Sequence, residues 1–445
     1  MLKQLRLLTG ISVFWLALSI LFDGINTLVL PVQLSTLGDQ QTQATRLGLL
    51  TFIGLLAGML IQPIAGILSD RWKPVLGRKG FIGIALLLTL VSLFFMALYQ
   101  SFLMLLLAYL MVQVSVSVAQ AGQQALIPDL VDKQHHGMAS GMKGFMDLAG
   151  AMIGFALLGQ LLGSGKIVLA IGAIAAALIT MYGVAVLLTP EDASGHEGTS
   201  RKNLSLRQAF RLDKKQDAAF LCVVVSRFLF LFGIYAIGRF LLLFVAERLG
   251  LGTDQAAAQA GTVLAALALI TALTSPIAGW LADRVGRVPL IIIGSILGAL
   301  SAMLLPWAKS TALILVFGAL MSIGSAAFSG GSWALLVDVI PGNQSARYFG
   351  LAHWGTAGAA AFAGLLGPLM DWSDRILPGS RFPVLFTVAA VAFLSSVLPL
   401  AHNSMKEVKY VGKRGKRKTS TDAPGLAVVS LPADPAASQE DTHSP

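Results

Sequence analysis

PIAGILSDR, at Pro63–Arg71, recurs as PIAGWLADR at Pro276–Arg284, so that seven of nine residues are unchanged 213 positions later. A second match lies further along each half, at a spacing of 209 residues. It pairs four residues with four: Ala125, Leu126, Asp129 and Gly141 with Ala334, Leu335, Asp338 and Gly350. The two spacings differ by four because the first copy holds Trp72–Leu76 where the second holds only Val285. We therefore predict a duplicated unit with one four-residue insertion.

The composition around these repeats is typical of a membrane protein. Of the 445 residues, 56% are hydrophobic and 12% are charged, whereas a soluble domain carries about 25% charged residues. The apolar residues come in blocks of about 20, the length that an α-helix needs to cross a bilayer. We predict an all-α polytopic protein with twelve transmembrane helices in two six-helix bundles. The expected spans are 10–34, 45–69, 80–98, 102–124, 137–163, 167–189, 218–246, 257–281, 289–308, 311–336, 348–370 and 382–402.

The basic residues divide unequally between the two sides that twelve spans create. Both termini and the middle stretch share one side, which holds 24 of the 32 Lys and Arg residues, against 6 on the other. Because cationic loops stay in the cytoplasm during insertion, we expect both termini there, in a plasma or bacterial inner membrane. This asymmetry also explains the net charge of +10 without a nucleic-acid partner.

The expected domain plan has four parts. Residues 1–189 form the first bundle, 190–217 a cytoplasmic linker, 218–402 the second bundle and 403–445 a tail. The tail carries a basic run at Lys413–Lys418 and is expected to be disordered. Two roles remain open for it: attraction to anionic lipid, or binding of a regulatory partner.

The repeated loops resemble the signature loop of the major facilitator superfamily, which implies the fold of that family and a transport function. The residues that carry the resemblance are Gly66, Asp70, Arg71, Gly77 and Arg78 in the first copy and Gly279, Asp283, Arg284, Gly286 and Arg287 in the second. Glycines here would let helices approach closely and would close the turn. In the family this loop is a cytoplasmic latch between the halves, so the resemblance implies that these charges help to hold an outward-open state. The alternative is that they only enforce topology.

Five further charged residues join the expected cytoplasmic gate: Asp129, Lys143, Asp147, Asp338 and Arg347. Lys143 and Asp147 are four residues apart on one helix and can pair with one another. That pair is either self-neutralised or part of the gate. The first loop copy, SDRWKPVLGRKGFI from Ser69, is also longer than the second. In this it resembles glycoside–cation and sucrose–proton symporters, which implies a sugar or glycoside as solute.

Asp23 lies near the middle of the first expected span, where a charge costs at least about 2.5–3.5 kcal/mol. It should therefore face a cavity, be protonated or have a partner. Asn26 falls on about the same helix face, and burial favours a neutral carboxyl group, which suits a proton carrier. Three roles remain open for Asp23: proton coupling, a hydrogen bond to the substrate, and a structural pair with an arginine. Span seven offers Arg227 and Arg239, and we expect Arg239 to reach the outer interface.

Polar faces on other spans supply the remaining cavity candidates. Span four repeats amides and a hydroxyl at helical spacing, at Gln113, Ser117, Gln120 and Gln124. In lipid this face would leave polar groups unsatisfied, so it either lines a cavity or joins helices. The other candidates are Asn26, Arg227, Tyr235, Ser329, Trp333, His353 and Trp354. Amides and hydroxyls beside aromatic rings suit a neutral, hydroxylated solute such as a sugar.

Duplicated bundles can rock about a central site and open it to each side in turn. We therefore expect a secondary active transporter of a small polar solute, proton-coupled and monomeric, whose partners are the solute, protons and the lipid bilayer. Two alternatives stay open: an exporter of hydrophobic or amphipathic compounds, and a non-transporting membrane assembly protein. The sequence holds no phosphate-binding loop of the required spacing and no His/Cys metal cluster. Enzyme activity, a cofactor and a metal site are not expected.

Overall fold

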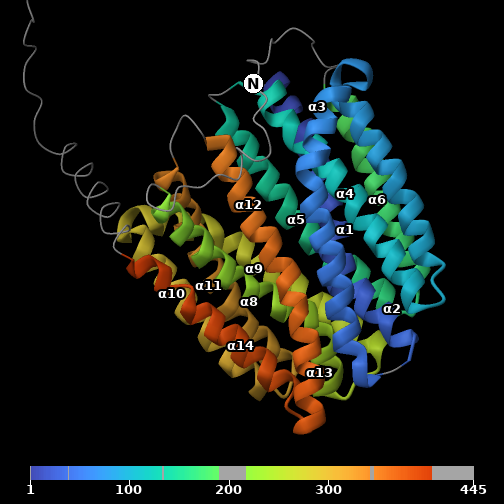
Figure 1. Ribbon diagram of the computed structural model, residues 1–445, viewed down its shortest axis with the longest axis vertical. Helices are drawn as coiled ribbons and strands as arrows, with labels where there is room; N and C mark the ends of the chain where they lie inside the picture. Colours follow the sequence, from blue (N-terminus) through green and yellow to red (C-terminus); the bar gives the residue numbers. More distant parts are fainter. Residues whose placement is uncertain (1, 39, 133–134, 190–216, 341–344, 403–445) are drawn as a thin grey trace, which may run out of the picture.

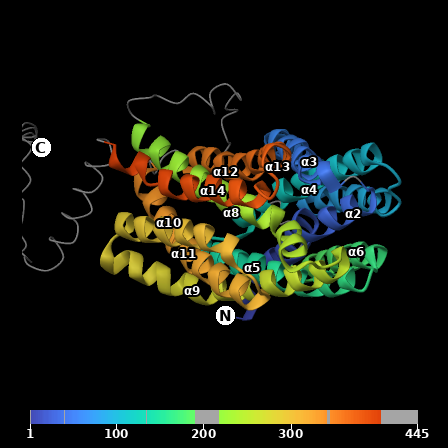
Figure 2. The ribbon, with the colours of Figure 1, turned by 90° about the horizontal axis from the view of Figure 1, so that it is seen from below.

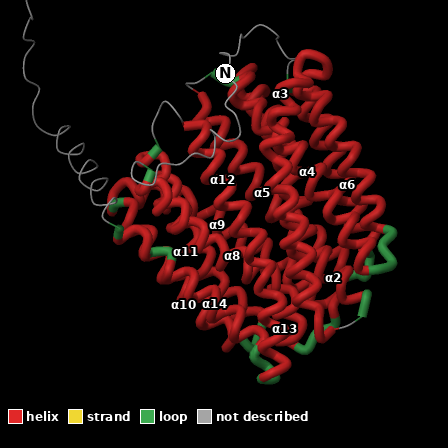
Figure 3. Tube along the Cα trace, in the orientation of Figure 1, coloured by secondary structure: helices red, strands yellow, loops and turns green. Residues whose placement is uncertain are grey.

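The computed structural model describes residues 2–38, 40–132, 135–189, 217–340 and 345–402. The expected linker, apart from Asp217, and the expected tail lie outside the described residues. The described part consists of helices joined by short loops, as Figure 3 shows. The all-α prediction is confirmed.

The helices form two groups that lie side by side as two bundles (Figures 1 and 2). The first group comprises α1 (Leu2–Gly24), α2 (Leu30–Thr36), α3 (Gln43–Ala97), α4 (Phe102–Leu130), α5 (His136–Gly163) and α6 (Ile167–Leu188). The second comprises α8 (Ala218–Leu249), α9 (Thr253–Val285), α10 (Arg287–Leu304), α11 (Thr311–Val339), α12 (Ser345–Phe362), α13 (Leu366–Ile376) and α14 (Arg381–Ser395). The chain therefore divides into two halves at the place that the internal repeat predicts.

Ten helical segments of the described chain are long and apolar enough to cross a membrane, and they correspond to twelve crossings. Helix α3 has 55 residues, a length of about 80 Å, whereas the hydrocarbon core of a bilayer is about 30 Å thick. Its backbone leaves the helical conformation at Gly77, and Arg78 bonds back to Ser69, so α3 supplies two crossings. A 3-10 turn at Ala363–Leu365 separates α12 from α13, which together supply one more. The prediction of twelve transmembrane helices in two bundles is confirmed.

The ends of the crossings define two faces of the molecule. The N-terminal face holds the start of α1 and the turns at Gly77 and Gly286, and it lies at the top of Figure 1, with α13 at the opposite face below. Gly77 and Gly286 have φ angles of 64° and 106°, which glycine adopts without the steric penalty of a Cβ atom. Both copies of the repeat therefore need glycine to make this turn, as predicted.

The bundles are sealed against one another at the opposite face by backbone contacts between glycines. Between α3 and α13, a Cβ atom added to Gly367 would lie 2.0 Å from the carbonyl oxygen of Ala44. Between α5 and α9, a Cβ atom added to Gly261 would lie 2.6 Å from the Cα atom of Gly159. Neither place has room for a side chain, so the two halves touch here through their main chains.

Candidate functional site

Two cavities lie between the bundles, with volumes of about 290 and 230 Å³. Phe22, Asp23 and Tyr235 line both of them, so the two cavities meet at these side chains. The larger cavity extends to Gln124 and Lys143, near the N-terminal face, where Gln124 is exposed. Because the opposite face is sealed, the pathway in this structure is open toward the N-terminal face.

The predicted polar face of α4 lines the larger cavity: Gln113, Ser117, Gln120 and Gln124 are all in its wall. Behind them lies a side chain that the sequence analysis missed, the fully buried Tyr109. The Tyr109 hydroxyl donates to Asn26 Oδ1 at 2.5 Å and accepts from Gln113 Nε2 at 2.8 Å. This chain of hydrogen bonds holds one cavity residue on α4 against a second in the π-helical segment Ile25–Val29. The signal was the position of Tyr109, one helical turn before Gln113.

Asp23 lies directly before that π-helical segment, a distortion that often marks functional positions. The Ser19 hydroxyl oxygen is 2.9 Å from Asp23 Oδ2 and 2.8 Å from the backbone carbonyl oxygen of Asp147. A hydroxyl has one proton, so Ser19 can donate to only one of these two acceptors at full strength. A protonated Asp23 completes the network, because it can donate to Ser19 while Ser19 donates to the carbonyl group.

Arg239 corrects the sequence prediction. Expected at the outer interface, it is only 5% exposed and lines the smaller cavity together with Asp23. Its Nη2 atom donates to the carbonyl oxygen of Ala360 at 3.1 Å. The rotation of α8 against α12 turns this side chain inward, and a single sequence does not reveal that rotation.

Tyr235 and His353 line the cavities as predicted, whereas four other candidates are not among the lining residues: Arg227, Ser329, Trp333 and Trp354. Arg227 is instead bound within the second bundle. Its Nη1 atom donates to the Ser332 hydroxyl at 2.6 Å, and its guanidinium group lies 4.4 Å from the centre of the Trp333 ring. We therefore separate Arg227 from the site and retain Arg239.

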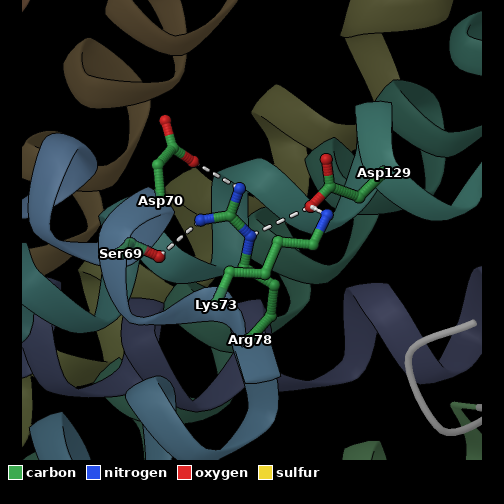
Figure 4. A network of polar contacts seen from close by, with 5 residues as sticks. All are labelled: Ser69, Asp70, Lys73, Arg78 and Asp129. Carbon is green, nitrogen blue, oxygen red and sulfur yellow. Dashed lines mark hydrogen bonds and ion pairs between the residues drawn. The ribbon is translucent and has the colours of Figure 1, made fainter. Parts of the chain in front are cut away.

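The first copy of the repeated loop forms one network of charges, which Figure 4 shows. Arg78, whose side chain is 4% exposed, donates to Asp70 at 2.5 Å, to Ser69 at 2.7 Å and to Asp129 at 2.9 Å. Lys73 reaches the same oxygen of Asp129 at 2.9 Å. The network ties the turn of α3 to the end of α4 and stays within the first bundle.

The second copy repeats the central contact of that network. Arg287, which corresponds to Arg78, pairs with Asp338, which corresponds to Asp129. The residues matched in sequence therefore make matching contacts in space. The side chains of Arg71, Asp283 and Arg284 are exposed, with Arg284 lying over the Trp280 ring. The side chain of Arg347 lies outside the described residues.

Two glycines of the repeat do not act as expected. No atom lies within 4 Å of a Cβ atom added to Gly66 or to Gly279, so close helix approach does not explain them in this conformation. Lys143 and Asp147 pair at 3.8 Å, as their spacing predicts, and the Lys143 ammonium lies 3.9 Å from the centre of the Trp15 ring. Both line the larger cavity rather than the loops.

Comparison with known proteins places this architecture. A family model described as Major Facilitator Superfamily matches residues 14–258 and again residues 228–432, which corresponds to the two halves. The chain belongs to the Major Facilitator Superfamily. It is thus a multi-pass membrane transporter that carries a small-molecule solute, and not an enzyme. No curated protein matches the sequence.

Solved structures of other Major Facilitator proteins share the fold at low sequence identity. A bacterial homologue of the human lysosomal transporter Spinster, in an inward-facing and occupied conformation, matches with TM-score 0.67 and 15% identity over 95% of this chain and 99% of that one. The nucleoside transporter NupG gives TM-score 0.66 and 13% identity over 89% and 100%. A peptide transporter, POT, as a point mutant in complex with sulfate, gives 0.65 and 13% over 92% and 95%. These likenesses concern the fold alone.

Proposed function

We propose that this Major Facilitator protein is a proton-coupled transporter of a small polar solute, with Asp23 as the group that takes up and releases the proton. The observation that carries the proposal is the position of Asp23, where the two cavities between the bundles meet. A carboxyl group there lies on the solute pathway. The Ser19 contacts favour its protonated form in the conformation described. In a transporter that alternates between two faces, such a group can be loaded on one side and emptied on the other.

The amides and hydroxyls of the larger cavity make sugars and glycosides the first solutes to test. Gln113, Ser117, Gln120 and Gln124 offer donors and acceptors along one wall, and such groups can replace the water around a hydroxylated solute. The excess of basic residues on the N-terminal face further supports a cell-membrane location with that face in the cytoplasm. The open side of the pathway in this structure is then the inward side.

A second function is favoured by the smaller cavity, whose wall is mostly apolar. Phe22, Phe155, Leu264, Leu267 and Met321 all contribute to it, and this surface suits a solute with a hydrophobic part. Export of amphipathic compounds is therefore the alternative. Purified protein in vesicles decides between the two, because flux of labelled sugars but not of amphipathic cations supports the first function and the reverse result supports the second.

Asp23→Asn should abolish accumulation of the identified solute against its gradient and spare solute exchange. Asparagine keeps the size and polarity of the side chain but cannot carry a proton. Accumulation driven by a pH gradient is measured in proteoliposomes, alongside counterflow of labelled solute without a gradient. Asp254→Asn, an exposed carboxyl group at the start of α9, is the control and should behave like the wild type. Uphill accumulation that persists in Asp23→Asn would show that the coupling group lies elsewhere.

A further inference from the structure

We propose that the transported solute carries an anionic group, such as a carboxylate, and that Arg239 binds it in the smaller cavity. The inference rests on the proposed transport function, since it names the chemistry of what the same cavity holds. Five observations support it: the burial of Arg239, its unsatisfied donors, the absence of a counter-ion among the described residues, the apolar wall around it, and the neutral state of its neighbours.

Arg239 has donors that the described residues do not satisfy. Its Nη2 atom binds the Ala360 carbonyl oxygen, but Nε and Nη1 are buried and have no hydrogen-bond partner in the described part of the chain. These two nitrogens carry three of the five N–H bonds of a guanidinium group. A buried charge is normally both paired and hydrogen-bonded. Arg239 lines a cavity, so a ligand in that cavity can supply the missing acceptors.

No protein carboxylate in the described structure neutralises Arg239. Asp23 shares its cavity, but no ion pair joins the two, and Asp23 contacts Ser19 instead. Asp147, which lines the larger cavity, pairs with Lys143. When Asp23 is protonated, the smaller cavity thus contains one positive charge without a counter-ion.

The wall of the smaller cavity strengthens the preference for an anion. Leu264, Leu267 and Met321 are part of it, and apolar side chains exclude water and so reduce the screening of the guanidinium charge. A neutral solute would leave that charge uncompensated. An anion entering with the proton on Asp23 makes the loaded cavity electrically balanced, and the amides of α4 remain free to bind hydroxyl groups on the rest of the solute.

The test is ligand-dependent thermal stability of the purified full-length protein, with matched acids and amides. The probes are glucuronate against glucuronamide, for a hydroxylated body, and phenylacetate against phenylacetamide, for an apolar body. At least one acid should raise the melting temperature, because a ligand that binds the folded state stabilises it. Its amide should bind about tenfold or more weakly, since charge-assisted hydrogen bonds are roughly twice as strong as neutral ones.

Arg239→Gln should remove the difference between acid and amide, whereas Arg248→Gln should keep it. Arg248 lies on the same helix, outside both cavities, and binds the Ala308 carbonyl oxygen. Equal binding of acid and amide by the wild type would overturn the proposal, as would no response to either acid. Discrimination that survives in Arg239→Gln would place the anion at another residue. If Arg239→Gln does not fold, the wild-type comparison decides alone.

The failure of this inference is distinguishable from the failure of the proposed function. Acid-selective binding without any flux in vesicles would refute transport and leave the anion site in place. Proton-coupled flux of a neutral sugar, with no preference for acids, would refute the anion site and leave the transport function in place.

Discussion

Gly367→Val is expected to reduce transport at least tenfold by preventing the opposite face from closing. A Cβ atom at this position would lie 2.0 Å from the carbonyl oxygen of Ala44 and 2.7 Å from its carbonyl carbon, both backbone atoms of α3. Extra carbon atoms in a packed interface typically cost about 1–3 kcal/mol, and α3 can yield only by moving away from α13. Since each 1.4 kcal/mol changes an equilibrium tenfold, the closed state should become rare. The measurement is initial solute uptake into proteoliposomes.

Gly172→Val is the matched control for this substitution. No atom lies within 4 Å of a Cβ atom added to Gly172 in α6, so valine there meets no obstacle and uptake should stay at the wild-type level. Wild-type uptake by Gly367→Val would contradict the account, because it would mean that transport does not need the backbone contact between α3 and α13.

Asp371→Ala should open the same face by removing a buried carboxylate that joins the two bundles. Asp371 is 2% exposed; its Oδ2 atom accepts from the backbone N–H of Thr45 at 2.6 Å, and its Oδ1 atom is 3.0 Å from Arg381 Nη2. Thr45 lies in the first turn of α3, where N–H groups have no partner within the helix and the helix dipole favours an anion. Asp371 of the second bundle therefore caps a helix of the first.

Breaking a buried pair by removing one partner typically costs about 3–5 kcal/mol, so we expect the closed state to fall more than a hundredfold relative to the open one. The measurement is the maleimide labelling rate of Thr51→Cys, a buried α3 position near Gly364, in a Cys222→Ser background. Labelling should be much faster with Asp371→Ala. Glu247→Gln is the control, since Glu247 is 52% exposed and 3.7 Å from the same Arg381, and exposed pairs contribute only about 0–1 kcal/mol. Equal labelling rates in the two variants would rule out Asp371 as a closing contact.

The features that the sequence could predict are those encoded by local pattern. Hydropathy locates the spans, and the repeat locates the division into halves as well as the matching contacts Arg78–Asp129 and Arg287–Asp338. The polar face of α4 was visible because residues three and four apart share a helix face. The position of Asp23 in a long apolar run indicated a cavity, and the structure places it there.

The features that could not be predicted depend on how helices rotate and pack against one another. Arg239 turns into a cavity rather than outward because of the orientation of α8, which has no local signal. Tyr109 looks like any aromatic residue of an apolar span until Asn26 is brought to it from α1's continuation. Among many glycines, the sequence pointed to Gly66, whereas Gly367 makes the close contact between the halves. Those contacts join residues hundreds of positions apart.

The central claim is that the two bundles rock about the cavity, so that one face opens as the other closes. Its most direct test uses spin labels on two pairs of exposed positions, one residue of each pair in each bundle, in a Cys222→Ser background. Val75 and Val285 report on the N-terminal face, and Leu98 and Leu377 on the opposite face. Relative to the parent protein, Asp371→Ala should lengthen the distance between Leu98 and Leu377 and shorten the distance between Val75 and Val285. Distances that stay constant in both pairs, or that change in the same direction, would contradict alternating access.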